Sequence, residues 1–338
     1  MSLPGVLLVN TGSPDAPDVP AVRRYLDQFL MDGRVLDLPR PLRRFIVSAF
    51  ILPGRPRRSA AAYRAIWWPE GSPQIVLGRR LVERLQHRLA VPVALAMRYG
   101  NPSIAAGLRE LWSHGIDSLL LVPLFPHYAM ATTASVVAET QAVLARLRPG
   151  LPLRVLPPFY ADSRYIAALV ANARPYLDAG YEHLLFSYHG LPERHLRKTD
   201  PTGRHCLRVT ACCTTPGPAH ATCYRHQVLR TTALFVQAAG VPADRYSLAF
   251  QSRLGRDRWL QPATADELVR LAQSGIRHVL VVCPGFVADC LETLEEIGMS
   301  GRETFLAAGG ERFTLIPALN DHPDWVMALT ALIEEALR

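Results

Sequence analysis

The 338-residue chain lacks the features of several common protein classes. No run of apolar residues approaches the ~20 that a membrane-spanning helix needs. Residues 1–5 lack the basic start of a secretory signal. There is no zinc-finger, RRM or helix-turn-helix pattern, and the arginines are scattered rather than striped. We therefore expect a soluble, cytoplasmic protein that has no nucleic-acid partner.

Nucleotide-binding signatures are also missing. No G-x-G-x-x-G follows an apolar run, and no G-x-x-x-x-G-K-[ST] occurs. A nicotinamide or ATP enzyme is thus disfavoured, and we expect no nucleotide cofactor. The chain is 49% hydrophobic and 20% charged, which favours a large core over disorder. Its net charge of +8 suits an anionic membrane surface or an acidic small molecule.

Short apolar runs alternate with helical periods along the chain. Continuous apolar runs are typical of strands buried on both faces, as in parallel sheets. They occupy residues 6–10, 93–97, 118–123, 184–187, 247–250, 278–283 and 314–316. The helical periods occupy residues 19–30, 77–89, 135–147, 164–177, 265–274 and 325–337. This alternation predicts an α/β fold with parallel sheets flanked by helices.

The pattern occurs twice, because each half has a helix that ends in Gly before a strand, at residues 114–123 and 274–284. We predict two similar domains, residues 1–155 and 156–338, with the last helix packing back on the first domain. Ligands of such sheets bind at the carboxyl ends of strands. The residues to inspect are therefore Asn10, Arg98, 125–128, 188–189, 251–253 and 286–296.

His189 follows one predicted strand and precedes the turn at residues 190–192. Imidazole titrates near neutrality and suits proton transfer. A loop histidine that hydrogen-bonds to backbone fits the same position equally well.

Asp289, Glu292 and Glu296 follow another predicted strand, at offsets of three and four that place them on one helix face. They could form an oxygen-rich path for a divalent cation. They could instead be a solvated face that favours a helix N-terminus, and the residues alone favour this second interpretation.

The apolar segment 45–53 is flanked on both sides by arginines. An apolar patch inside a basic collar suits a flat ligand with acidic arms or an anionic membrane surface. A core helix with a solvated arginine collar is the alternative.

Four of the six cysteines, Cys206, Cys212, Cys213 and Cys223, lie within one insert. Structural disulfides are disfavoured in a reducing compartment. The spacing does not match the usual zinc pairs. Four thiolates suit an iron–sulfur cluster, but consecutive cysteines diverge in extended backbone. Structural zinc and free thiols stay open.

Nearly end to end, an ordered set of motifs resembles the ferrochelatases. Each motif is weak alone, but the order is specific. The motifs occupy residues 7–14, 25–32, 67–73, 97–102, 124–128, 187–192, 250–255, 259–262 and 283–297.

The resemblance implies two Rossmann-like chelatase domains with a porphyrin cleft between them, and insertion of Fe²⁺ into protoporphyrin IX as the terminal step of haem synthesis. It implies that His189 and Glu292 face each other across the macrocycle, as catalytic residues and metal contacts. Asp289 and Glu296 would continue the metal path. Implied porphyrin contacts are Asn10, Thr11, Arg55, Arg98, Tyr128, Trp259 and Phe286.

Some bacterial relatives carry an internal cysteine segment with a [2Fe–2S] cluster, which the resemblance implies for the four clustered cysteines here. Segment 45–52 resembles the family's hydrophobic lip, so we expect peripheral contact with the inner membrane.

Two positions depart from the pattern: Thr11 stands where relatives often have a larger side chain, and Cys290 where some have His. The alternatives are a chelatase for coproporphyrin or another metal, and a non-catalytic tetrapyrrole or metal carrier. The sequence contains no pattern that predicts the oligomeric state.

Overall fold

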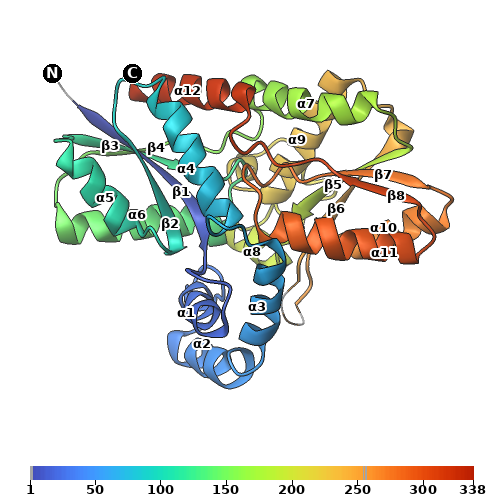
Figure 1. Cartoon of the computed structure of the whole chain (residues 1–338), viewed down its shortest axis with the longest axis horizontal. Helices are drawn as coiled ribbons and strands as arrows, with labels where there is room; N and C mark the ends of the chain where they lie inside the picture. Colours follow the sequence, from blue (N-terminus) through green and yellow to red (C-terminus); the bar gives the residue numbers. More distant parts are fainter. Residues whose placement is uncertain (1–2, 254, 256) are drawn as a thin grey trace. The chain divides into compact units, whose positions relative to one another are not determined.

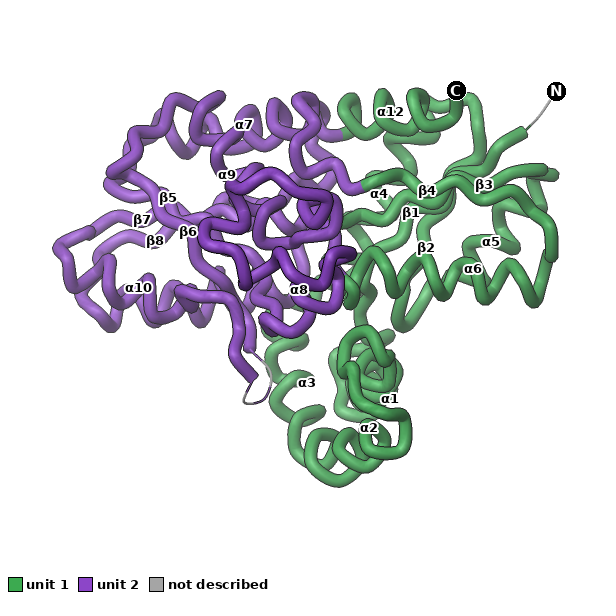
Figure 2. The backbone as a smooth tube through the Cα atoms, turned by 180° about the vertical axis from the view of Figure 1, so that it is seen from behind, with its two compact units in different colours: residues 1–125, 130–157, 326–338 green, residues 126–129, 158–325 purple. Residues whose placement is uncertain are grey.

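The computed structural model describes residues 3–253, 255 and 257–338. The chain divides into two compact units (Figure 2). Unit 1 comprises the described residues up to Phe125, Met130–Pro157 and Val326–Arg338. Unit 2 comprises Pro126–Ala129 and Pro158–Trp325.

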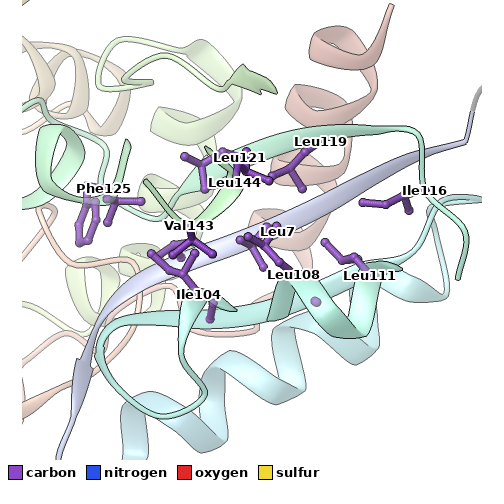
Figure 3. Packing of buried hydrophobic residues seen from close by; sticks show 14 residues of the cluster. Leu7, Ile104, Leu108, Leu111, Ile116, Leu119, Leu121, Phe125, Val143 and Leu144 are labelled. Atoms are coloured by element: carbon purple, nitrogen blue, oxygen red, sulfur yellow. The ribbon is translucent and has the colours of Figure 1, made fainter. Parts of the chain in front are cut away.

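Unit 1 is built on a four-stranded parallel sheet with strand order β2-β1-β3-β4 (Figure 1). The strands are β1 (Pro4–Ser13), β2 (Val93–Gly100), β3 (Ser118–Pro123) and β4 (Leu153–Val155). Leu7 in the central strand β1 pairs with Ala94 on one side and Leu121 on the other. All three are buried in a core formed with Leu108 and Val143 from the helices (Figure 3). Both faces of β1 are buried, which explains its continuous apolar run.

The helices of unit 1 follow from their apolar faces and end signals. In α1, Asp18 caps the first turn by accepting a hydrogen bond from the Ala21 amide at 2.7 Å, and Val22, Leu26 and Leu30 are buried. The segments are α1 (Val19–Leu30), α2 (Arg40–Ile46), the π-helix η1 (Val47–Ile51), α3 (Arg55–Ile66), α4 (Pro73–Gln86), α5 (Ile104–Ser113), the π-helix η2 (Met130–Ala134), α6 (Ser135–Leu147) and most of α12 (Pro323–Leu337).

Unit 2 repeats the plan of unit 1, with a parallel sheet in the order β6-β5-β7-β8. Its strands are β5 (His183–His189), β6 (Tyr246–Gln251), β7 (His278–Val282) and β8 (Arg312–Leu315). The predicted α/β fold with two similar halves is therefore confirmed.

The remaining segments of unit 2 connect and cover these strands. They are α7 (Ser163–Asp178), α8 (Glu193–Thr199), the 3₁₀ turn η3 (Pro218–Ala221), α9 (Tyr224–Ala239), the 3₁₀ turn η4 (Ala243–Arg245), α10 (Thr264–Gln273), the π-helix η5 (Glu292–Gly301) and α11 (Arg302–Ala307). Within the described part of the chain, no helix is both long and apolar enough to cross a bilayer.

Two local expectations are wrong. Asp289, Glu292 and Glu296 do not share one α-helix, because Asp289 precedes η5 and the two glutamates lie in its wider π-helical turns. The arginine collar of segment 45–53 is incomplete, because Arg43 is buried and donates to the carbonyls of Leu36 and Leu38. The hydrogen bonds to these two backbone carbonyls replace the bonds to water that the Arg43 guanidinium loses on burial.

Candidate active site and cysteine segment

His189 is the last residue of β5, at the carboxyl edge of the unit 2 sheet. The register pairs His189 with Gln251, the last residue of β6, and Phe186 with Val282, the last residue of β7. Parallel strands bring these ends to one edge, where such sheets bind their ligands. The predicted place of His189 at a strand end is confirmed.

A single hydrogen bond fixes the protonation pattern of the His189 ring. Its Nδ1 lies 2.6 Å from the Gly190 carbonyl oxygen. A carbonyl only accepts, so Nδ1 carries the hydrogen and the neutral ring has its lone pair on Nε2. The Tyr224 hydroxyl donates to the His189 carbonyl at 2.9 Å. The rings of Trp259 and Phe286 each lie 6.5 Å from the imidazole, measured between centroids.

Gly190 leaves little room for a side chain. A Cβ there would lie 3.0 Å from the carbonyl oxygens of both Gln251 and Ser252. Its amide donates to the Gln251 carbonyl at 2.6 Å. The turn after His189 therefore lies tightly against the end of β6, which holds the histidine in place.

The backbone of Glu292 is anchored to the same sheet edge. The Gln251 amide Nε2 donates to the Glu292 carbonyl at 2.8 Å, while its Oε1 accepts from the Ser187 hydroxyl at 2.8 Å. Gln251 is buried, so both bonds are shielded from water. Glu292 begins η5. Segments of π-helix are rare in proteins, and those that occur are often at functional sites.

Ser252 binds both oxygens of the Glu296 carboxylate. Its amide donates at 2.7 Å and its hydroxyl at 2.6 Å. Ser252 has φ +64°, a conformation that costs energy in a residue with a Cβ. Burial raises the pKa of Glu296, and the nearby Glu292 charge adds to this, against the lowering effects of Ser252 and His189. The charges of His189 and Glu292 therefore both act on the Glu296 carboxylate.

The side chain of Asp289 is buried, and its carboxylate accepts hydrogen bonds from two residues of unit 2. It accepts from the Thr293 hydroxyl at 2.9 Å and from the Asn320 amide Nδ2 at 2.7 Å. These bonds fix the loop that leads into η5.

In unit 1, Arg98 is held by an acidic partner that the sequence analysis missed. Its guanidinium donates to Asp32 at 2.7 Å and to the Ser135 hydroxyl at 2.7 Å, and lies 4.5 Å over the Tyr99 ring. Only 13% of the Arg98 side chain and 4% of that of Asp32 are exposed. Burial works to raise the pKa of Asp32, but hydrogen bonds from Ser135 and the Arg34 amide and the Arg98 charge lower it overall.

The other expected porphyrin contacts of unit 1 are Asn10, Thr11 and Arg55. Asn10 is buried in β1 and accepts from the Thr11 amide at 2.8 Å. Arg55 begins α3. Tyr128 belongs to unit 2, where its amide donates to the Gln227 side chain at 2.7 Å.

Cys206, Cys212, Cys213 and Cys223 all belong to unit 2, and none is in a disulfide. The interaction with the Cys213 thiol is the largest cause that lowers the pKa of Cys223, to about 6. Burial raises the pKa of Cys206 to about 12. Two backbone amides point at sulfur: Leu207 at Cys212 (3.4 Å) and His226 at Cys223 (3.5 Å).

The four thiols match a four-thiolate group in the number and type of donor atoms. A cavity of about 690 Å³ borders the segment, with Cys212, Cys213, Arg225 and Trp259 in its wall. In residues 3–253, 255 and 257–338, no group of three or more His, Cys, Asp or Glu is arranged to hold a metal ion.

Solved structures define the class of this fold. SirB from Bacillus subtilis with Fe³⁺ aligns with a TM-score of 0.56 and 15% identity, over 99% of this chain and 95% of that one. The sirohydrochlorin chelatase SirB from Bacillus subtilis subspecies spizizenii, in complex with cobalt, also aligns with a TM-score of 0.56, at 11% identity and the same coverage. At these identities the likeness shows the fold alone: a two-domain chelatase fold.

Sequence comparison identifies the family within that class. A family model described as ferrochelatase matches residues 4–337. The ferrochelatase of Ectopseudomonas mendocina is 54% identical over 98% of this chain and 97% of its own length. That of Azotobacter vinelandii is 55% identical over 97% of both chains. The chain belongs to the ferrochelatase family, and the predicted resemblance is confirmed.

Proposed function

We propose that this enzyme, a metal-chelating lyase, inserts Fe²⁺ into protoporphyrin IX to form haem, with His189 and Glu292 as its catalytic residues. Membership of the ferrochelatase family supports the activity. The observation that carries the residue assignment is the hydrogen bond from His189 Nδ1 to the Gly190 carbonyl, which leaves Nε2 as a proton acceptor. The non-catalytic carrier is disfavoured, because a carrier needs no base beside two carboxylates.

Metallation releases two pyrrole N–H protons for each Fe²⁺ that enters, so the site must accept both. His189 Nε2 takes one, and the resulting imidazolium keeps its Nδ1–H bond to Gly190. The Glu296 carboxylate interacts with the charge of His189 and stabilises the new positive charge. The carboxylate of Glu292 delivers the metal or takes the second proton. Asp289, whose carboxylate accepts from Thr293 of η5 and from Asn320, continues the proposed metal path.

The porphyrin contacts remain those implied by the family. Trp259 and Phe286 supply apolar walls beside His189. Asn10, Thr11, Arg55, Arg98 and Tyr128 complete the proposed set. The carboxylate of Asp32 fixes the guanidinium of Arg98, so we propose that Arg98 acts in a preset orientation.

Replacing His189 tests the assignment. His189→Ala should lower the rate of Fe²⁺ insertion by about 100-fold or more, the usual range for losing a general base. Porphyrin affinity, measured by quenching of porphyrin fluorescence, should stay within a few-fold. His114→Ala is the matched control, because His114 is exposed at the end of α5. Near-normal turnover of His189→Ala would remove the assignment, and parallel assays with coproporphyrin test the choice of porphyrin.

We also propose that Cys206, Cys212, Cys213 and Cys223 bind a [2Fe–2S] cluster. The four free thiols in one segment and the two amides directed at sulfur support this. When bound, such a group supplies one-electron redox chemistry. Visible absorption and iron analysis of anaerobically purified protein decide it. A colourless, iron-free sample would overturn this proposal and leave the iron-insertion proposal intact.

Finally, we propose a cytoplasmic enzyme that contacts the inner membrane peripherally through segment 45–52. Phe45 is 60% and Phe50 71% exposed, and their rings form a T-shaped pair with centroids 5.7 Å apart. Two exposed phenylalanines beside arginines suit an anionic bilayer surface. Phe50→Ser should reduce co-sedimentation with phosphatidylglycerol vesicles. The control Leu147→Ser, on α6, should not, although Leu147 is 38% exposed.

A further inference from the structure

Three histidines surround the peptide groups of the adjacent cysteines Cys212 and Cys213. They come from three places: His205 precedes Cys206, His220 lies in η3, and His226 lies in the first turn of α9. We propose that these imidazoles are positioning residues that hold the Cys212–Cys213 pair in the geometry of a thiolate-ligand site. The inference rests on the proposed cysteine site, but the three histidines are not among the proposed ligands.

Each imidazole binds a backbone carbonyl of the pair. His205 Nε2 and His220 Nε2 lie 2.8 and 2.9 Å from the carbonyl oxygen of Cys212. His226 Nδ1 lies 2.7 Å from the carbonyl oxygen of Cys213. Because carbonyls only accept, all three rings donate, so the tautomer of each neutral ring is defined. Both lone pairs of the Cys212 carbonyl are used.

The three rings also pack against one another. His220 and His226 are stacked with centroids 3.6 Å apart, and His205 meets His220 edge-on at 5.5 Å. Gly217 permits this packing, because a Cβ there would lie 3.0 Å from the His205 ring. The donors are therefore held in place by their own contacts as well as by the hydrogen bonds.

The backbone that they bind is strained. Leu207 and Ala211, which flank the turn leading to the pair, have φ values of +59° and +52°. Residues with a Cβ rarely adopt this region, and such strain persists only where the surroundings over-determine it. Asp200 anchors the start of the same turn, accepting from the amides of His205 and Cys206 at 2.7 and 2.9 Å.

The consequence concerns the two thiols. Neighbouring side chains diverge in extended backbone, so an adjacent cysteine pair converges on one site only if its peptides are rotated out of that conformation. The imidazoles fix the rotation of both peptides. At the two ends of the segment, backbone amides are directed at sulfur, from Leu207 to Cys212 at 3.4 Å and from His226 to Cys223 at 3.5 Å.

The test exploits the position of each donor nitrogen. Gln places an amide N–H near Nε2 of His, and Asn places one near Nδ1. The triple variant His205→Gln/His220→Gln/His226→Asn should therefore keep the carbonyl bonds. The triple variant His205→Leu/His220→Leu/His226→Leu removes them, and the three single leucine variants cover the case in which the triple variant does not fold.

Two measurements are made on each full-length protein. The first is iron and sulfide content after anaerobic reconstitution with Fe²⁺ and sulfide, together with the EPR spectrum after reduction. The second is the alkylation rate of each cysteine by iodoacetamide in metal-free protein, resolved by mass spectrometry. We expect leucine variants to lose cluster occupancy and to alkylate Cys212 and Cys213 about tenfold faster, with the amide variant close to wild type. Iron insertion into porphyrin should change less than twofold.

Unchanged occupancy, spectrum and alkylation in the triple leucine variant would overturn the inference. A wild type that takes up no iron or sulfide would overturn the cluster proposal only. Alkylation would then still decide the role of the histidines: faster reaction at Cys212 and Cys213 supports it, and equal rates overturn it.

Discussion

His127 should make the stability of this enzyme depend on pH below neutrality. It is 3% exposed and enclosed by the rings of Tyr188 and Tyr224, at 5.5 and 5.8 Å. Thr231 donates to a backbone carbonyl at 2.8 Å and so accepts from His127 Nε2, also at 2.8 Å. Nδ1 is then a bare lone pair, with no partner among the described residues. Burial lowers the pKa of His127 to about 3.

The magnitude follows from linkage. A histidine whose folded-state pKa lies below its unfolded value of 6.5 binds its proton only on unfolding. Its contribution to stability is therefore complete above pH 6.5 and is lost as the pH falls toward 3. Between pH 7 and pH 5 this one residue should lower the free energy of unfolding by about 2 kcal/mol.

The variant His127→Phe removes the ionisable group and keeps a ring. At pH 7 it should be less stable by about 1 kcal/mol, the value of one hydrogen bond. Because it escapes the acid penalty, its stability should overtake that of wild type between pH 6 and about pH 5. Urea unfolding followed by near-UV circular dichroism measures both curves. His114→Phe, at an exposed position, should run parallel to wild type. Parallel curves for His127→Phe would refute the reasoning.

Three further outcomes are expected. Asp32→Asn leaves the buried Arg98 with only the more exposed Glu139 carboxylate, 3.8 Å away, and should cost about 3 kcal/mol of unfolding free energy at pH 7. Because the pKa of Asp32 is lowered in the folded state, this loss should shrink only at acid pH, and a loss under about 1 kcal/mol would contradict the pairing. Gly12→Ala places a Cβ on a backbone carbonyl of β2 at φ +111° and should lower the melting temperature sharply, so an unchanged melt would argue against the tight pairing. Tyr224→Phe removes the hydroxyl bond to the His189 carbonyl. It should lower kcat by about three- to tenfold with KM for porphyrin nearly unchanged, whereas a change in KM alone would assign Tyr224 to binding.

The fold could be predicted well in segments whose apolar residues follow a single helix or strand pattern. The observed bounds of α1 (Val19–Leu30), α6 (Ser135–Leu147) and β3 (Ser118–Pro123) equal the predicted ones. In these segments one face of the helix or both faces of the strand are buried in the core. The pattern of apolar residues therefore predicts both the type of element and its bounds. β4 (Leu153–Val155) escaped prediction because three partly exposed residues carry no such pattern. Its pairing with β3 defines it as a strand.

The candidate site was partly visible for a different reason. His189 could be singled out because strand ends are where ligands bind, and residues 251–253 stood at the same kind of position. What Gln251 and Ser252 do there depends on register: Gln251 binds the Glu292 backbone, and Ser252 binds the Glu296 carboxylate. The wider π-helical turn at Glu292–Gly301 has no signature in residue spacing, so offsets of three and four predicted an α-helix instead.

The two sheets share more than strand order. In each, the third strand along the chain is followed by a π-helical segment: η2 after β3 and η5 after β7. The segment in unit 2 carries Glu292, Glu295 and Glu296, whereas Met130–Ala134 in unit 1 has no acidic residue. The same position in the order of elements is therefore π-helical with acidic residues in unit 2 and without them in unit 1. It follows that the π-helical turn does not need the negative charges, so replacing Glu292, Glu295 and Glu296 by neutral residues should leave η5 folded.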